Sequence, residues 1–161
     1  EALERAVRAV AETATASAVA DPRLERRDAL EVDLTRQLGG DWRDKVRILP
    51  ATAAYVARLE QLAAPEHAVE VVAHHYVRYL GDISGGQVIA ARLGALYGID
   101  PDALNFYDFT AIGKIPPYRN GYRQRIDEMR LVEAERAALI SEAQAAFAFN
   151  SGIFAELDRL H

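Results

Sequence analysis

The chain has 161 residues, a formal net charge of −5, no cysteine and a composition that is half apolar. This length allows one domain with a hydrophobic core, and the apolar content excludes a disordered chain. The lack of cysteine excludes disulfides, thiolate chemistry and cysteine-ligated metal, and the charge argues against nucleic acid as the main partner. No apolar run is long enough to span a bilayer and no signal-peptide pattern is present, so we expect a soluble, cytoplasmic protein without membrane contact.

Helix signals fill the first half of the chain. Residues 1–14 carry apolar side chains at helical spacing, namely Leu3, Val7, Val10 and Ala14. Asp21 and Pro22 are typical of an N-cap and a first helical position, and that helix is expected to end at the glycine pair 39–40. A short turn is expected over 41–46. Pro50 opens a further helix, over 50–64.

The second half continues in the same way. Pro65 opens a long helix that Gly98 ends, with Pro101 as a further stop. The aromatic stretch 105–117 is expected to be a loop, 118–129 a shorter helix, and 131–160 a long final helix. Because no strand pattern, repeat or linker interrupts these segments, the sequence predicts a single all-α domain over residues 1–161.

The stretch YLGDISGGQ, residues 79–87, contradicts its helical surroundings. Each of its three glycines weakens a helix by roughly 1 kcal/mol relative to alanine. On a helical wheel Gly81, Gly85, Arg78 and Asp82 share one side. Close packing of a second helix would explain Gly81 and Gly85, but a neighbouring buried carboxylate is unfavourable unless it is paired or hydrated. A large planar ligand lying against the backbone, with Asp82 holding water, is the other interpretation.

The segment HHYVRYLGDISGGQVIAARL resembles the distal-helix signature of the heme oxygenase family. Further segments fit that family in the same order: LERRDALEVDL, LPATAAYVARL, YRNGYRQRIDEM and EAQAAFAFNSGIFAEL. The resemblance implies an all-α, single-domain heme oxygenase-like fold with a long, glycine-kinked distal helix. It implies oxidative cleavage of heme, which is both substrate and oxygen-activating cofactor, to biliverdin, carbon monoxide and ferrous iron. Dioxygen and a separate electron donor, a reductase or ferredoxin, are the further partners it implies.

The resemblance also assigns site residues. Asp82 matches the family aspartate that orders water and helps deliver a proton to dioxygen, and Arg78 and Asn150 match members of the same hydrogen-bond network; their alternatives are a surface ion pair and an amide inside a helix. Heme contacts are implied for the motif residues Gly81, Ser84, Gly85 and Gly86. The resemblance implies pocket-lining positions at Tyr76, Phe147 and Phe154, for which a role in the core is the alternative, as it is for Tyr79.

Arg119 and Arg123 stand four residues apart, so both guanidinium groups project from one helix face. Arginine suits carboxylates because its charge is permanent and its donors are planar. The matching family positions are basic and hold the two heme propionates. We therefore expect these arginines to bind the propionates.

The iron ligand of the family is a proximal histidine on its first helix. That helix is expected upstream of Glu1, so the domain is expected to lack it and the chain to be incomplete for activity. His67, His74, His75 and His161 are poor substitutes, and no metal ligand is assigned within the chain. Two other classes stay open: a non-catalytic heme- or bilin-binding protein on the same fold, and a helical interaction module without a ligand.

Overall fold

The computed structural model describes residues 1–160, and no strand occurs among them. Contacts along the chain cluster into two compact units. Unit 1 comprises Glu1–Ala20, Ile48–Arg78 and the chain from Tyr122 onward, and unit 2 comprises Asp21–Arg47 and Tyr79–Gly121. The predicted all-α class is confirmed.

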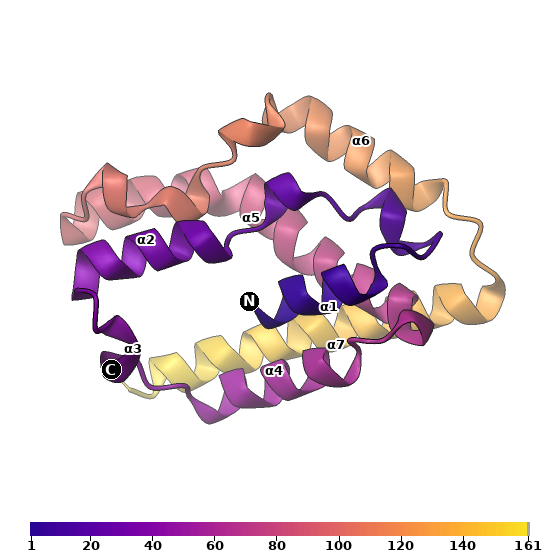
Figure 1. Ribbon diagram of the computed structural model, residues 1–161, viewed down its shortest axis with the longest axis horizontal. Coiled ribbons are helices and arrows are strands. Elements are labelled where there is room, and N and C mark those ends of the chain that lie inside the picture. The colour runs from indigo at the N-terminus through magenta and orange to yellow at the C-terminus, as the bar shows by residue number, and fades with distance from the viewer. Residues whose placement is uncertain (161) are drawn as a thin grey trace. The chain divides into compact units, whose positions relative to one another are not determined.

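Unit 1 is built on helices that pack side by side. Its elements are α1 (Ala2–Val10), η1 (Ala16–Ala18), α4 (Pro50–Gln61), η3 (Pro65–His67), the first part of α5 (Ala68–Tyr97), the end of α6 (Ile115–Asp127) and α7 (Glu133–Asp158). Helix α4 contacts both α1 and α7, and Figure 1 shows it running alongside α7. The buried apolar side chains of unit 1 include Ala6, Val10, Leu59, Leu62, Val71 and Val72.

Unit 2 combines helices with short 3₁₀ turns. Its elements are η2 (Pro22–Leu24), α2 (Arg27–Leu38), α3 (Trp42–Lys45), the remainder of α5, η4 (Pro101–Ala103), η5 (Asn105–Tyr107), η6 (Thr110–Ile112) and the start of α6. Helix α2 packs against η4 and η5. Leu24, Ile83, Phe109 and Ile112 are buried here.

Local signals explain most helix ends. Pro50 occupies the first turn of α4, as predicted, and the backbone N–H of Ala51 donates to Glu156 Oε2 of α7 at 2.8 Å. This carboxylate satisfies one of the N–H groups that a helix start leaves open. Gly98 follows α5 with a φ of +64°, a conformation that glycine adopts without strain, so the predicted end of the long helix is confirmed.

Several boundaries differ from expectation. The long helix expected from Pro65 begins at Ala68, since residues 65–67 form the 3₁₀ helix η3. The helix predicted from Asp21 is split into η2 and α2, because the Arg26 side chain donates to the backbone oxygens of Leu24, Glu25 and, from a distant segment, Asp108. Helix α6 begins at Ile115 rather than 118; its prolines fall in the first turn, where no backbone donor is required. Helix α1 ends at Val10, so Ala14 lies outside it and is exposed.

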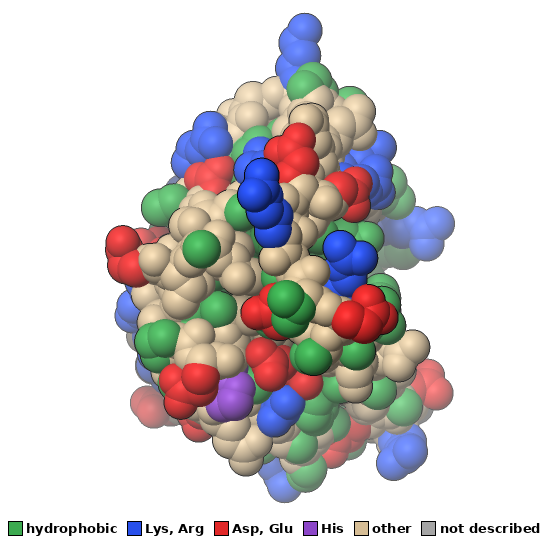
Figure 2. All heavy atoms as spheres, turned by 90° about the vertical axis from the view of Figure 1, so that its right-hand side faces the viewer, with side chains coloured by type: hydrophobic (Ala, Val, Ile, Leu, Met, Phe, Trp, Pro, Cys, Tyr) green, Lys and Arg blue, Asp and Glu red, His purple; other side chains and the backbone are tan. Residues whose placement is uncertain are grey.

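The surface shown in Figure 2 carries acidic and basic side chains interspersed with apolar ones. No single sign of charge dominates this face. None of the helices within residues 1–160 combines the length and apolarity that crossing a bilayer requires.

A buried carboxylate fixes the 3₁₀ segment η5 in unit 2. Asp33 Oδ1 accepts from the backbone and side-chain nitrogens of Asn105, both at 2.8 Å, and Oδ2 accepts from the Phe106 backbone at 2.7 Å. Asp33 is buried on α2, a helix that otherwise buries little. This one side chain therefore anchors the turn to the helix.

We expect Asp33→Ala to destabilise the protein by about 1–3 kcal/mol, because partly buried backbone N–H groups would lose their acceptor. Denaturant unfolding measures the change. The control is Asp102→Ala, since the Asp102 side chain is 78% exposed and forms a surface ion pair with Arg36. Equal effects of the two substitutions would contradict the anchoring role of Asp33.

Candidate functional site

The glycines of α5 differ in what they face. Within unit 2, no atom lies within 4 Å of a Cβ built on Gly81 or Gly85. A Cβ on Gly86 would instead lie 3.1 Å from Tyr107 Cδ1 and 3.9 Å from Phe109 Cε2. Gly86 is thus a packing glycine, whereas Gly81 and Gly85 leave the helix backbone open. Helix α5 runs without interruption through all three glycines, and the predicted kink there stays a prediction.

Two polar groups of unit 2 accompany this open backbone. Asp82 is half-buried between the two open glycines. Arg119 Nη1 on α6 donates to Ser84 Oγ at 3.4 Å. The Arg119 Nε atom is buried and has no hydrogen-bond partner among the described residues. A guanidinium with an unused buried donor is suited to donate to a carboxylate ligand.

Unit 1 brings three other predicted site residues together. Tyr76, Arg123 and Phe147 line one cavity of about 420 Å³, with apolar side chains from α5, α6 and α7 around them. Its other lining residues are Val72, Ala73, Ile126, Asp127, Leu139, Ile140, Ala143 and Gln144. Phe154, which is 69% exposed, does not line it. Phe147, 60% exposed, belongs to the cavity wall and not to the core.

A chain of buried polar contacts runs through unit 1. Arg58 of α4 donates to both oxygens of Glu142 on α7, at 2.9 and 2.7 Å. His74 Nε2 lies 2.8 Å from Glu142 Oε1, and His74 Nδ1 lies 3.0 Å from the Tyr55 hydroxyl. The His74 side chain is 0% exposed. Phe149 stacks on the Tyr55 ring with centroids 5.0 Å apart, which fixes the plane of that ring.

The charges of the side chains in this series of contacts follow from burial and pairing. The hydrogen bond from Arg58 holds the pKa of Glu142 below its usual value, so Glu142 is a carboxylate that only accepts. Burial lowers the pKa of His74 despite the opposing effect of Glu142, so the imidazole is neutral. Its Nε2 therefore carries the proton and donates to Glu142, and Nδ1 accepts from Tyr55. Burial raises the pKa of Tyr55 to about 12, so its hydroxyl stays protonated.

This series of polar contacts ends at two predicted site residues. The Tyr55 hydroxyl is also hydrogen-bonded to the Asn150 side chain and feels the charge of Arg78. Asn150 Nδ2 donates to the Ala146 carbonyl at 2.7 Å. Because the Tyr55 proton is directed to His74, the amide nitrogen of Asn150 donates to Tyr55 as well, which leaves Asn150 Oδ1 to accept from water or a ligand.

No motif singles out Tyr55 or Glu142, which come from distant helices. The sequence feature that indicates these polar contacts is His74, a histidine in the apolar run that opens the long helix. A buried imidazole requires partners for both ring nitrogens, so a histidine there predicts that partners exist but not which ones. His74 has the structural role that the sequence favours.

We expect the protein to lose stability as the pH falls below about 6.5, the ordinary pKa of histidine. The unfolded chain then binds a proton at His74 that the folded chain binds only at lower pH, so stability rises with pH in this window. Glu142 acts in the same sense below about 4.5. Denaturant unfolding of His74→Gln should show a flatter dependence between pH 6.5 and 5, whereas His67→Gln controls for the loss of a histidine as such. Parallel curves for His74→Gln and wild type would contradict this.

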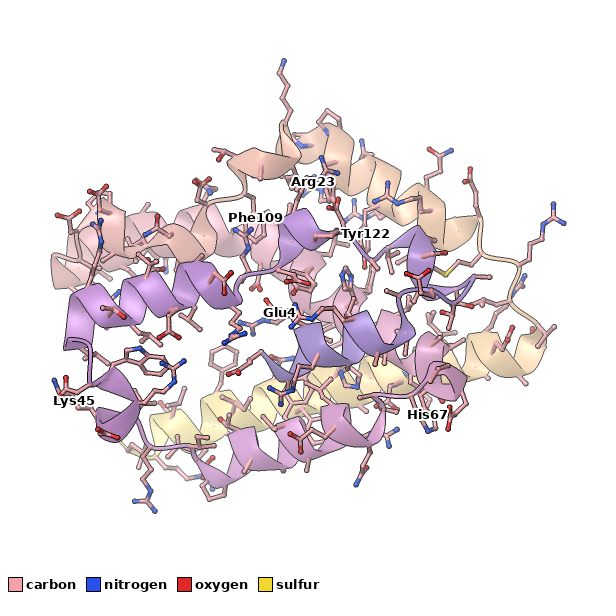
Figure 3. The ribbon with its side chains drawn as sticks, viewed as in Figure 1. Glu4, Arg23, Lys45, His67, Phe109 and Tyr122 are labelled. Carbon is pink, nitrogen blue, oxygen red and sulfur yellow. The ribbon has the colours of Figure 1, made fainter. Side chains whose placement is uncertain are left out.

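Both buried histidines are hydrogen-bonded within the protein. His74 uses both ring nitrogens, and His75 Nδ1 is 2.7 Å from the Tyr122 hydroxyl. His67, at the edge of unit 1 (Figure 3), lies 3.6 Å from Glu70. No cluster of three potential metal ligands occurs within residues 1–160, and His161 and the expected proximal ligand lie outside the described residues.

Known proteins resemble this chain over nearly its whole length. The family model described as heme oxygenase matches residues 1–156. Heme oxygenase 1 of Nostoc sp. is 38% identical over 136 residues, which are 84% of this chain and 57% of that protein. Heme oxygenase 1 of Homo sapiens is 36% identical over 139 residues, 85% of this chain and 48% of that protein. The chain thus spans about half the length of these curated relatives.

A solved structure agrees. The crystal structure of heme oxygenase-1 from Synechocystis sp., in complex with heme, superposes with a TM-score of 0.89 at 35% identity. The match covers 97% of this chain and 70% of that one. Family and fold point the same way, and the chain belongs to the heme oxygenase family.

Proposed function

We propose that this chain is the heme-binding part of a heme oxygenase, which uses dioxygen to cleave heme to biliverdin, carbon monoxide and ferrous iron. Its electrons would come from a separate reductase or ferredoxin. The observation that carries the proposal is the open backbone at Gly81 and Gly85, with Asp82 between them. A flat ring can approach such a surface closely, and a carboxylate beside it can hold water there.

The donor set of the chain fits heme, a planar apolar ring with two carboxylates. Arg119 has a buried Nε without a partner among the described residues, and Arg123 lines the unit 1 cavity beside Tyr76 and Phe147. Guanidinium groups suit the propionates, and aromatic walls suit the ring. The open space at Gly81 and Gly85 is space that any side chain would fill.

Each residue then has a defined task. Arg119 and Arg123 bind the propionates and so orient the ring, with Ser84 holding Arg119. Gly81 and Gly85 admit the ring, and Tyr76, Phe147 and Phe154 contact its apolar surface. Bound heme would supply both the iron that activates dioxygen and the carbon framework that is oxidised. Asp82 holds water and passes a proton through it. The family resemblance assigns Asn150 and Arg78 to the same hydrogen-bond network.

Two measurements on the purified protein test this. Hemin titration should produce a Soret band that saturates at one equivalent. Aerobic reduction, by ascorbate or a reductase, should then remove that band and produce a bilin. A stable Soret band without bilin would overturn the oxygenase assignment in favour of a binding protein. No Soret band would overturn heme binding altogether.

A further inference from the structure

A buried histidine that the proposed reaction does not use contacts α6. His75 Nδ1 lies 2.7 Å from the Tyr122 hydroxyl, and the two rings stack with centroids 5.7 Å apart and planes 8° apart. The side chains are 2% and 0% exposed. Tyr122 lies on the inner side of α6 (Figure 3). A satisfied buried polar pair fixes one arrangement of two helices, whereas an apolar contact allows them to slide.

Tyr122 is also held from other sides. The Tyr76 ring, next along α5, stacks on it with centroids 6.5 Å apart. The Arg125 guanidinium lies 5.7 Å from the centre of the Tyr122 ring, and Arg125 Nε donates to the Ala18 carbonyl at 2.7 Å. The position of Tyr122 in unit 1 is therefore determined by residues before it and after it in the sequence.

The residue that follows Tyr122 is Arg123. Successive residues of an α-helix point about 100° apart, so fixing Tyr122 fixes the direction in which Arg123 leaves α6. Arg123 lines the 420 Å³ cavity together with Tyr76, the neighbour of His75 on α5. Adjacent residues of α5 thus set both the position of the helix that carries Arg123 and one wall of the cavity that Arg123 lines.

We propose that His75 is a positioning residue that, through the Tyr122 hydroxyl, holds Arg123 in place to bind a carboxylate of the ligand in the unit 1 cavity. His75 itself touches no ligand. The inference rests on the proposed function in one respect, because it takes the carboxylate to be a heme propionate. An arginine has several rotatable bonds, and its preference for a carboxylate depends on a helix that does not shift.

The test compares two probes, hemin and hemin dimethyl ester, in which both propionates are neutral. The dissociation constant of the ester divided by that of hemin measures carboxylate recognition separately from ring binding, and a larger ratio means a stronger preference for the carboxylates. Wild type should prefer hemin, and Arg123→Leu should remove part of that preference. His75→Leu and Tyr122→Phe should each lower the ratio by roughly three- to tenfold, the size expected for one lost hydrogen bond. His75→Asn, which keeps a polar group near Nδ1, should restore part of it.

Controls separate positioning from folding. Val71→Ala, at a buried position one turn before His75, should lower the melting temperature but leave the ratio unchanged. In the Arg123→Leu background, His75→Leu should have no further effect on the ratio. Equal weakening of both probes by His75→Leu, or an unchanged ratio, would overturn the inference while leaving heme binding intact. Failure of wild type to bind either probe would instead overturn the proposed function.

Discussion

Asp82→Ala is expected to bind hemin and to lose most of its oxygenase turnover. Asp82 is a half-buried carboxylate between two glycines that leave the helix backbone open. Its replacement by alanine should therefore leave that open backbone unchanged. What it removes is the group that we propose holds water and transfers a proton. Loss of such a group typically lowers a rate by about 10²–10⁴. The measurement is the rate of bilin formation alongside a hemin titration.

The matched control for this prediction is Asp44→Ala, which removes an exposed carboxylate from the same unit. It should leave both hemin affinity and bilin formation at the wild-type level. Asp82→Asn adds a second comparison, since an amide can still order water but cannot carry the proton. Bilin formation by Asp82→Ala at the wild-type rate would show that Asp82 has no part in the reaction.

Gly85→Leu should strongly weaken heme binding without weakening the fold. Leucine favours a helix over glycine by up to about 1 kcal/mol, and within unit 2 no atom lies within 4 Å of the added Cβ. The melting temperature should therefore stay level or rise. The leucine side chain would occupy the space assigned to heme, so hemin affinity should fall by at least about a hundredfold, equivalent to about 2.7 kcal/mol.

Gly86→Leu gives the opposite pattern. Its Cβ would lie 3.1 Å from Tyr107 Cδ1, so the ring must move, and overpacking of this kind costs about 1–3 kcal/mol. Melting and hemin titration of the two variants together distinguish ligand space from helix packing. A sharp drop in melting temperature for Gly85→Leu with hemin affinity retained would favour the helix-packing interpretation of Gly81 and Gly85.

Local chemistry made the helices predictable. Pro50 and Gly98 act through their own backbone dihedrals, so their effects can be read without knowledge of the fold. The break between η2 and α2 could not be read, because Arg26 bonds the carbonyl of Asp108, which lies 82 residues away. The start of α6 was missed because two prolines suggest a loop, although a first helical turn tolerates both.

The candidate site likewise combines residues that the sequence indicates with residues that it does not. The motif around Asp82 and the paired arginines of α6 are local in sequence, and the family resemblance assigns them. The partners of His74 come from α4 and α7, 19 and 68 residues away, and nothing in the spacing of Tyr55 or Glu142 indicates that they meet. The contact of His75 with Tyr122 was equally hidden, because a histidine inside an apolar run shows only that some partner must exist.

The bond from Ala51 to Glu156 has a consequence for synthesis on the ribosome. These two residues are separated by 105 positions, and chains grow at about 5–20 residues per second, so the first turn of α4 waits about 5–20 s for its carboxylate. Glu142, the partner that α7 gives to Arg58 and His74, follows them by 84 and 68 positions and so also arrives late. Unit 2 ends at Gly121, so all of its residues have been synthesised while unit 1 still lacks α7.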